Sequence, residues 1–218
     1  MNSLNLLSNR TKRVDVDCLN LSEEERGSEK VEKEWKELNP LKLHLGCGKR
    51  YLPGWYHIDA VKHPNVQMVC DVSKLESFPD GVADEIYASH ILEHINRHQV
   101  VNVLKEWKRV LKPNGILRIA VPNFEAVVEH YNQHKNLSVI MGLLYGGQDS
   151  ALNYHYVTFD FSILKAILEG IGFRGIEKYD HKDFLPEGYD DFSRCYLPHL
   201  DESNGKLMSL NVVGYANP

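Results

Sequence analysis

Two glycines followed by an aspartate have the residue types and spacing that suit a nucleoside ligand. Gly46 and Gly48 follow a short apolar run, and Asp59, eleven residues after Gly48, ends a second apolar run. Glycine lets the backbone turn sharply and approach a ligand with no side chain in between. An acidic residue at the end of the second parallel strand is placed to accept both hydroxyls of a ribose. These residues predict a nucleoside-cofactor site at the carboxyl ends of a parallel sheet.

The details of this spacing argue against a dinucleotide cofactor. A dinucleotide fingerprint has a third glycine three residues after the second, and its acidic residue lies about 20 positions further on. Here Lys49, Arg50 and Tyr51 follow Gly48, and Asp59 comes early. The pattern therefore favours S-adenosylmethionine, with a nicotinamide dinucleotide as the weaker alternative.

The elements that must position these residues alternate between strands and helices. An apolar stripe with helical spacing predicts a helix over 96–111. Two further helices are expected, and seven strands: the helices over 124–131 and 161–170, the strands over about 42–46, 55–59, 66–71, 85–89, 116–121, 176–179 and 207–214. The first connection is too short for a crossover helix, so we expect at most one helical turn there. This order predicts a Rossmann-like α/β fold with a mostly parallel seven-stranded sheet and an antiparallel last strand, paired with the strand near 176.

The first forty residues differ in composition from the rest, with many polar residues and few apolar ones. Ser22 and Glu25 have the spacing of a capping box, which predicts a helix over about 22–38. One interpretation of residues 1–40 is a solvated extension with a charged helix. The other is a lid over the cofactor, carried by Trp35 and Leu38. Residues 41–218 then form the cofactor-binding domain.

Bulk composition excludes several classes of protein. A net charge of −5 and a pI of about 6.1 argue against a nucleic-acid-binding surface. No apolar run is long enough to span a membrane, and the first residues lack the pattern of a signal peptide. The four cysteines are scattered without a CxxC pair, which argues against a zinc site or a disulfide framework. We therefore expect a cytoplasmic protein with no nucleic-acid or membrane partner; its oligomeric state stays open.

Four motifs in order resemble the class I S-adenosylmethionine-dependent methyltransferases, and within them the methyltransferase type 11 group. They are the glycine motif at 45–48, Asp71 at the end of the third strand, the segment Ser89–Ile95 after the fourth, and the helix-to-strand junction at 109–117. The junction departs from the family pattern at Asn114, where glycine is commoner. The resemblance covers about residues 42–122. It implies S-adenosylmethionine as the cofactor and methyl transfer as the activity.

A closer resemblance is to a bacterial subfamily of predicted methyltransferases. The shared features are Pro53-Gly54-Trp55 at the end of the first connection, Gly146-Gly147-Gln148, His155, and Phe159-Asp160. Genes of that subfamily are often found among genes for surface polysaccharides. The resemblance therefore implies a sugar or another small molecule as the methyl acceptor.

Eight residues are expected to contact the cofactor. The turn at 46–48 can present backbone N–H groups to the methionine carboxylate. Asp59 is expected to bind the ribose, and Asp71 is implied by the resemblance to lie near the adenine amino group, with Val72 and Ala60 beside the ring. The full set is Gly46, Cys47, Gly48, Asp59, Ala60, Asp71, Val72 and Ser89.

Two histidines are candidates for catalysis. A hydroxyl acceptor stays protonated at neutral pH and gains from a general base. His90 directly follows the fourth strand, so we expect it near the reactive methyl group, as a base or as a group that orients the acceptor; it could instead be a hydrogen-bonded residue lining the cofactor. His155 lies in the irregular region that should cap the acceptor side, where it is either a second active-site group or a plain loop residue.

No metal site is expected from the sequence. Glu93 and His94 are adjacent, and such a pair resembles the position that some O-methyltransferases use for a divalent metal. Two residues cannot fill an octahedral site, so we expect them to serve packing. His130 and His134 lie four apart on a possible helix, but no third ligand is evident.

The favoured function is S-adenosylmethionine-dependent methylation of an oxygen atom on a small molecule or sugar. Tyrosines at 145, 154 and 156 either form a platform for a sugar ring or pack as ordinary loop residues. The alternatives are a non-catalytic relative that works through partners and an NAD-dependent oxidoreductase. Methylation of nucleic-acid bases is disfavoured, because the Asp/Asn-Pro-Pro-aromatic motif of such enzymes is replaced by Ser89-His90-Ile91-Leu92.

Overall fold

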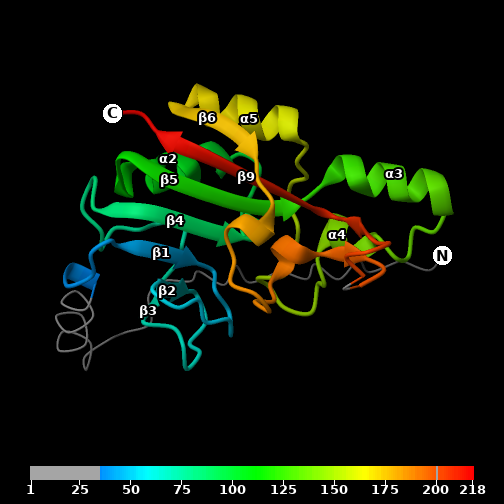
Figure 1. Cartoon of the computed structure of the whole chain (residues 1–218), viewed down its shortest axis with the longest axis horizontal. Helices are drawn as coiled ribbons and strands as arrows, with labels where there is room; N and C mark the ends of the chain where they lie inside the picture. Colours follow the sequence, from blue (N-terminus) through cyan, green and yellow to red (C-terminus); the bar gives the residue numbers. More distant parts are fainter. Residues whose placement is uncertain (1–34, 200) are drawn as a thin grey trace, which may run out of the picture.

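The computed structural model describes residues 35–199 and 201–218 of the chain (Figure 1). Most of the helix predicted over 22–38 lies outside these residues. Trp35 begins the described part as a buried side chain that packs against Phe78, with ring centroids 5.2 Å apart. This residue is therefore part of the core at the start of the sheet.

Seven strands form one sheet in the order β3-β2-β1-β4-β5-β9-β6. The first five strands are parallel to their neighbours, and β9 is antiparallel to both β5 and β6. The predicted mostly parallel sheet with an antiparallel last strand is confirmed. The strands are β1 (Lys42–Leu45), β2 (Tyr56–Asp59), β3 (Met68–Val69), β4 (Ala83–Ser89), β5 (Leu111–Pro122), β6 (Phe173–Lys178) and β9 (Ser209–Ala216).

The helices agree with the expected ones within a few residues. Helix α2 begins at Val100, after a turn that occupies the first residues of the predicted span, and α5 has the predicted bounds. Strand β5 begins earlier than expected because Leu111 already pairs with Ala83 of β4. The helical segments are η1 (Leu92–His94), α2 (Val100–Val110), α3 (Phe124–His134), α4 (Met141–Tyr145), α5 (Phe161–Gly170), η2 (His181–Asp183) and η3 (Phe192–Arg194), where η marks a 3₁₀ helix.

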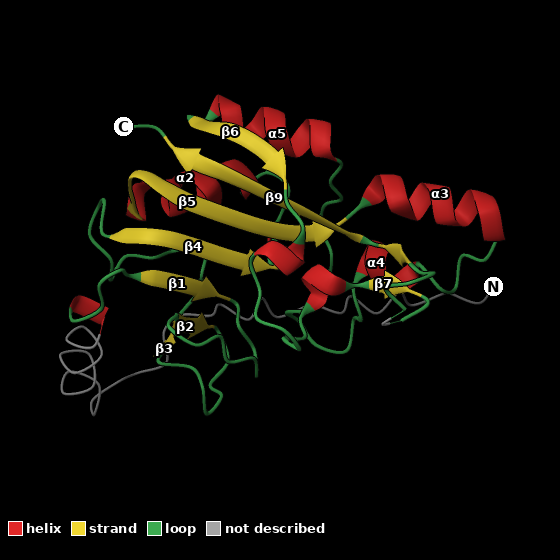
Figure 2. Cartoon of the chain, in the orientation of Figure 1, coloured by secondary structure: helices red, strands yellow, loops and turns green. Residues whose placement is uncertain are grey.

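Helices α2 and α5 pack on one face of the sheet, which carries the main apolar core (Figure 2). Side chains alternate between the two faces along each strand. Leu43 and Leu45 of β1 therefore point to this core, together with Trp107 of α2, while His44 points to the opposite face. The strict alternation fixes the register of β1 against its neighbours.

The opposite face is covered by a segment without long helices, residues 179–197. It carries η2 and η3 and crosses the sheet in front of β4 and β5 (Figure 1). Phe184 and Leu185 from this segment pack on Trp55 and Tyr87. As expected, the connection over 47–55 contains turns and no helix. A sheet face without its own crossover helices needs this alternative cover.

Beyond the carboxyl ends of the strands lies a smaller unit built from α3, α4 and the short strands β7 (Tyr196–Leu197) and β8 (Lys206–Leu207). Ala126, Ile140 and Met208 form its apolar centre. The unit holds the loop over 146–158 close to the strand ends. Within the described residues, no helix has the length and apolar character needed to cross a membrane.

Candidate functional site

The predicted cofactor residues meet at the carboxyl edge of the sheet. Leu45 of β1 pairs with Ile58 of β2 and with Ala88 of β4, so the residues that follow these three lie at the same edge of the sheet. These following residues are Gly46, Asp59 and Ser89. Parallel strands therefore bring together side chains that are up to 43 positions apart in the sequence.

A pocket of about 440 Å³ opens at this edge. Its walls include five of the eight residues predicted to bind the cofactor: Gly46, Asp59, Ala60, Asp71 and Val72. The other three, Cys47, Gly48 and Ser89, do not line it.

Asp59 is the best-placed polar group of this pocket. Its Oδ2 accepts a hydrogen bond from the Gly48 N–H at 2.7 Å, and its Oδ1 accepts one from the Val61 N–H at 2.8 Å. A carboxylate oxygen offers two lone pairs, so each oxygen keeps one for a ligand hydroxyl. The two backbone bonds hold the carboxylate in a fixed orientation, as the predicted contact with a ribose requires.

The turn over 46–48 does not present free N–H groups, contrary to the expectation for the methionine carboxylate. The N–H groups of Gly46 and Cys47 both point to the Ile58 carbonyl, at 2.7 and 3.3 Å, and that of Gly48 binds Asp59. The N–H groups of this turn are thus all hydrogen-bonded to β2. They stabilise the fold in this structure, and the glycines contribute the backbone conformation of the turn.

Gly46 has a specific steric reason to be glycine. Its φ is +62°, and a Cβ there would lie 1.9 Å from Cδ1 of Ile91. Ile91 itself lines the cofactor pocket. Gly48 has a φ of +55°, and a Cβ there would meet no atom within 4 Å. Gly46 is therefore required by packing as well as by backbone conformation, and Gly48 by conformation alone.

Cys47 is an inert side chain that fills space. Burial, and to a lesser degree the nearby charge of Asp59, raise the pKa of its thiol to about 12. A thiol with such a pKa is protonated at neutral pH and is a poor nucleophile. This agrees with the space-filling role expected from the sequence.

Several pocket residues were not identified from the sequence. Ile95 belongs to the motif after β4 but was not assigned to the site, and Asn153 and Phe192 come from distant loops. Phe192 lies in η3, more than 130 residues after the glycine motif. No local pattern marks it, because its position depends on how the segment 179–197 crosses the sheet.

A second pocket of about 390 Å³ adjoins the first. The two share His94, Asn153 and Phe192 as wall residues. The second pocket also contains both predicted catalytic histidines, His90 and His155. The structure therefore brings these two histidines, 65 residues apart in the sequence, to one cavity beside the cofactor pocket.

His90 is held by protein groups on both ring nitrogens. Its φ of +54° is unusual for a residue with a side chain and turns the ring away from the strand direction. Nδ1 lies 3.0 Å from Oε1 of Glu93, and Nε2 lies 3.2 Å from Oγ of Ser209. With both nitrogens engaged, the geometry favours a positioning role for His90 over that of a free base.

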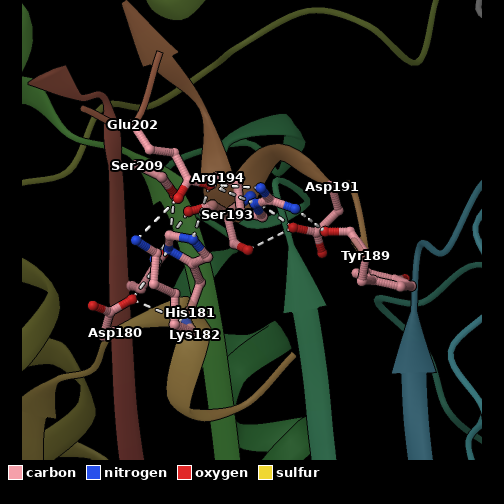
Figure 3. A network of polar contacts seen from close by, with 10 residues as sticks. Asp180, His181, Lys182, Tyr189, Asp191, Ser193, Arg194, Glu202 and Ser209 are labelled. Carbon is pink, nitrogen blue, oxygen red and sulfur yellow. Dashed lines mark hydrogen bonds and ion pairs between the residues drawn. The ribbon is translucent and has the colours of Figure 1, made fainter. Parts of the chain in front are cut away.

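A polar network continues from His90 into the segment 179–197. Ser209 donates its hydroxyl to Asn211, whose amide donates to the Ser193 carbonyl at 3.0 Å. Figure 3 shows Ser193 beside Asp191, to which it donates both its N–H and its hydroxyl. This chain of hydrogen bonds connects the cover of the sheet to the second pocket.

Glu93 is fully buried, with 0% of its surface exposed. Apart from the His90 contact, neither carboxylate oxygen has a hydrogen-bond partner among the described residues. Burial by itself raises the pKa of this carboxyl, but the charge and hydrogen bond of His90, followed by the charge of His94, outweigh burial and lower it. The site thus holds a buried anion that lacks full hydrogen bonding.

His94 and His155 lie next to this carboxylate and against each other, with ring centroids 4.8 Å apart. Nδ1 of His94 contacts the Tyr154 carbonyl at 3.1 Å, and Nδ1 of His155 contacts the Leu143 carbonyl at 3.0 Å. Burial lowers the pKa of His155, which favours its neutral ring. His155 therefore lines the second pocket with a lone pair on Nε2.

The comparisons agree with this geometry. A family model described as a methyltransferase domain matches residues 55–119. The match runs from the residue before β2 into β5 and includes Asp59, Asp71 and the segment Ser89–Ile95. This stretch, less than a third of the chain, is similar to a methyltransferase domain. Together with the order of the sheet, this supports a class I methyltransferase, an enzyme whose cofactor is S-adenosylmethionine.

Three solved structures are similar to this chain. A SAM dependent methyltransferase from Archaeoglobus fulgidus has a TM-score of 0.50 and 16% identity, covering 88% of this chain and 97% of that one. The YcgJ protein from Bacillus subtilis has a TM-score of 0.46 and 16% identity, covering 89% and 99%. A Burkholderia thailandensis 1,6-didemethyltoxoflavin-N1-methyltransferase has a TM-score of 0.47 and 13% identity, covering 90% and 80%. At these identities the likeness concerns the fold alone. No curated protein sequence matches the chain significantly.

Proposed function

We propose that this methyltransferase transfers the methyl group of S-adenosylmethionine to a hydroxyl oxygen of a small molecule or sugar. The observation that carries the proposal is the meeting of the two pockets at His94, Asn153 and Phe192. A cofactor in the first pocket would face an acceptor in the second across these shared residues. Methyl transfer needs this arrangement, because the acceptor must approach the sulfonium carbon in line with the departing sulfur.

The cofactor would take its orientation from the strand ends. Asp59 would accept the ribose hydroxyls with the lone pairs that Gly48 and Val61 leave free. Asp71 and Val72, further along the same pocket, would face the adenine. The methionine end would then point toward β4 and the second pocket.

The acceptor pocket carries groups that suit a hydroxyl. A hydroxyl keeps its proton at neutral pH, so its methylation gains from a nearby group that accepts the proton. Nε2 of His155 offers a lone pair, and Glu93 supplies negative charge beside it. Tyr154 and Tyr156 flank His155 in the sequence and are exposed, but they do not line this pocket. His155 and Glu93 therefore support a polar acceptor.

The choice of acceptor atom is tested with a panel of acceptors. The purified chain is incubated with S-adenosylmethionine and matched sugars that carry a hydroxyl, an amine or a thiol at the same position, and formation of S-adenosylhomocysteine is measured. We expect turnover with the hydroxyl compounds, and less with His155→Ala. Turnover confined to the amine or thiol compounds would refute oxygen methylation.

The cofactor site is tested by binding. We expect S-adenosylhomocysteine to raise the melting temperature and NAD to leave it unchanged. Asp59→Asn should weaken S-adenosylhomocysteine binding by at least about 10-fold, since hydrogen bonds to a charged group contribute about 1.5–3 kcal/mol each. Asp80→Asn is the matched control, because Asp80 pairs with Arg109 away from the pocket. Equal affinities of the two variants in calorimetry would exclude Asp59 from the site.

A further inference from the structure

Three side chains in the acceptor pocket have the chemistry of a metal site. Glu93, His94 and His155 each offer one ligand atom, and these atoms all lie within 4.8 Å of one another. We propose that they bind a divalent first-row transition-metal ion such as Zn²⁺. From the sequence, Glu93 and His94 were not expected to bind a metal because two residues are too few, and the third ligand, His155, lies 61 residues after His94.

The backbone fixes these three residues relative to one another. Tyr156 donates its N–H to the Glu93 carbonyl at 2.8 Å, and His155 donates its N–H to the Tyr145 carbonyl at 3.1 Å. The loop after α4 is therefore fastened to η1 through Tyr156 and to the end of α4 through His155. A preformed ligand set of this kind pays less ordering entropy when it binds an ion.

The histidines are held in the tautomer that metal ligands need. A carbonyl oxygen can only accept a hydrogen bond, so the Nδ1 atoms that contact the Tyr154 and Leu143 carbonyls carry the hydrogen. In each neutral ring the lone pair then lies on Nε2. Metal-bound histidines characteristically donate their second ring N–H to a carbonyl or carboxylate in this way.

The carboxylate of Glu93 needs a cation. It is fully buried, and apart from the His90 contact its oxygens have no hydrogen-bond partner in the described part of the chain. A buried carboxylate is costly unless it is paired or coordinates a metal. An ion between Glu93 and the two Nε2 atoms would supply the missing partner, while His90 holds the carboxylate from the other side.

The donor set indicates the class of ion. Two imidazole nitrogens and one carboxylate oxygen suit Zn²⁺ and related transition ions, whereas Mg²⁺ prefers oxygen ligands. With bonds of about 2.0–2.2 Å in a tetrahedral site, the ligand atoms lie about 3.4 Å from each other, so a cluster whose atoms lie within 4.8 Å of one another would have to close by up to about 1.4 Å around the ion. Three protein ligands leave at least one position open toward the pocket, as in catalytic zinc sites.

An open position gives the ion a role in the reaction, and this role rests on the proposed methyl transfer to a hydroxyl. The acceptor hydroxyl would coordinate the ion through its oxygen. Coordination would lower the pKa of this hydroxyl, so that the hydroxyl proton would pass to water in the pocket. The alkoxide oxygen then forms a bond to the methyl carbon as the bond from carbon to sulfur breaks. The products are a methyl ether and neutral S-adenosylhomocysteine. His155 acts in this case by holding the ion.

Metal binding is measured without any reference to activity. The untagged full chain is treated with a chelator, desalted and titrated with Co²⁺, followed by absorption, and with Zn²⁺ and Mg²⁺, followed by calorimetry. We expect one Zn²⁺ or Co²⁺ per chain and no comparable binding of Mg²⁺. Because the loss of an outer-shell partner already costs about 10–100-fold in affinity, Glu93→Gln and His155→Ala should each lose at least about 100-fold.

The controls separate this site from other histidines and from misfolding. His134→Ala removes the exposed pair with His130, whose rings are 4.4 Å apart, and should leave the tight site intact. The affinity for S-adenosylhomocysteine serves as the test of folding for all variants. Failure of the wild-type chain to bind Zn²⁺ or Co²⁺, or binding that is unchanged in both Glu93→Gln and His155→Ala, would overturn the metal site. Binding of S-adenosylhomocysteine in the same samples would still support the proposed methyltransferase function.

Discussion

Gly46 and Gly48 look equivalent in the sequence and have different tasks in the structure. Both have a positive φ, but a side chain at Gly46 would collide with Ile91, while a side chain at Gly48 would meet open space. Ile91 is thus the residue that makes the first glycine necessary. Since Ile91 also lines the cofactor pocket, this contact sets the shape of the pocket wall.

Alanine substitutions at the two glycines should therefore differ in cost. Gly48→Ala carries only the penalty of a left-handed backbone, about 1–2 kcal/mol. Gly46→Ala carries the same penalty and overpacking against Ile91, so its total cost should be about 3 kcal/mol. Urea unfolding of both variants measures the difference. Ile91→Ala should recover part of the loss in the Gly46→Ala background, and equal costs for the two glycine variants would contradict the steric explanation.

The segment 179–197 connects the cover of the sheet with the site. It buries Tyr87 and Trp55 on the face that has no crossover helices, and it places Phe192 in both pockets. Pro53-Gly54-Trp55 ends the short first connection with Trp55 packed under this cover, its ring 5.7 Å from that of Phe184. The shared motif therefore has a structural task here. The face beneath the cover is also unusually polar, with His44 and His57 fully buried.

These buried histidines predict a specific response to acid. Burial, then the positive charges of His57 and Arg50, lower the pKa of His44 from its usual 6.5 to about 3. The folded state thus keeps His44 neutral while the unfolded chain takes up a proton below pH 6.5. Stability is therefore present above the unfolded pKa and is lost as the pH falls from 6.5 toward 3, by up to about 1.4 kcal/mol per pH unit.

The variant His44→Phe lacks this titrating group and keeps a ring next to Tyr87. As the pH falls from about 7 to 5, the free energy of unfolding of this variant should fall less steeply than that of the wild-type chain. The two slopes should differ by up to about 1.4 kcal/mol per pH unit. Urea unfolding at several pH values gives the slopes. The exposed His134 is a control site, and His134→Ala should keep the wild-type slope. A His44→Phe slope equal to that of the wild type would show that His44 is not kept neutral.

At the scale of the whole molecule, the two edges of the sheet have separate tasks. The pockets lie at the carboxyl edge, where Gly46 follows β1. Trp35 precedes β1, and Figure 1 shows the start of the described chain beside the amino end of that strand. The interpretation of Trp35 as part of a lid over the cofactor is therefore not supported, and this residue belongs to the core.

Trp35→Leu separates stability from cofactor binding. The variant loses the ring contact with Phe78 and leaves a cavity, which should cost about 2 kcal/mol in the free energy of unfolding. Because Trp35 does not line the pocket, the affinity for S-adenosylhomocysteine should stay within about twofold. Denaturation and calorimetry on the same sample measure both quantities. A large loss of affinity for S-adenosylhomocysteine in the folded variant would support the interpretation of Trp35 as part of a lid over the cofactor.

The sequence by itself determined the sheet and the residues at its strand ends. Apolar runs and helical stripes are local signals, and parallel strands place Gly46, Asp59 and Asp71 at one edge wherever the rest of the chain goes. The methyltransferase motifs depend on the same local order. The positions of these three residues were therefore predictable from spacing, and their contacts with the cofactor stay predictions.

The residues from distant loops that complete the pockets at these strand ends are placed there by the tertiary structure alone. Glu93 and His155 meet because a backbone hydrogen bond joins Tyr156 to Glu93 across one strand, three helices and an irregular stretch of the chain. Phe192 reaches the pockets because a sheet face without its own helices needed another cover. Contacts of this kind arise from the path of the chain through space, which no local pattern of residues records.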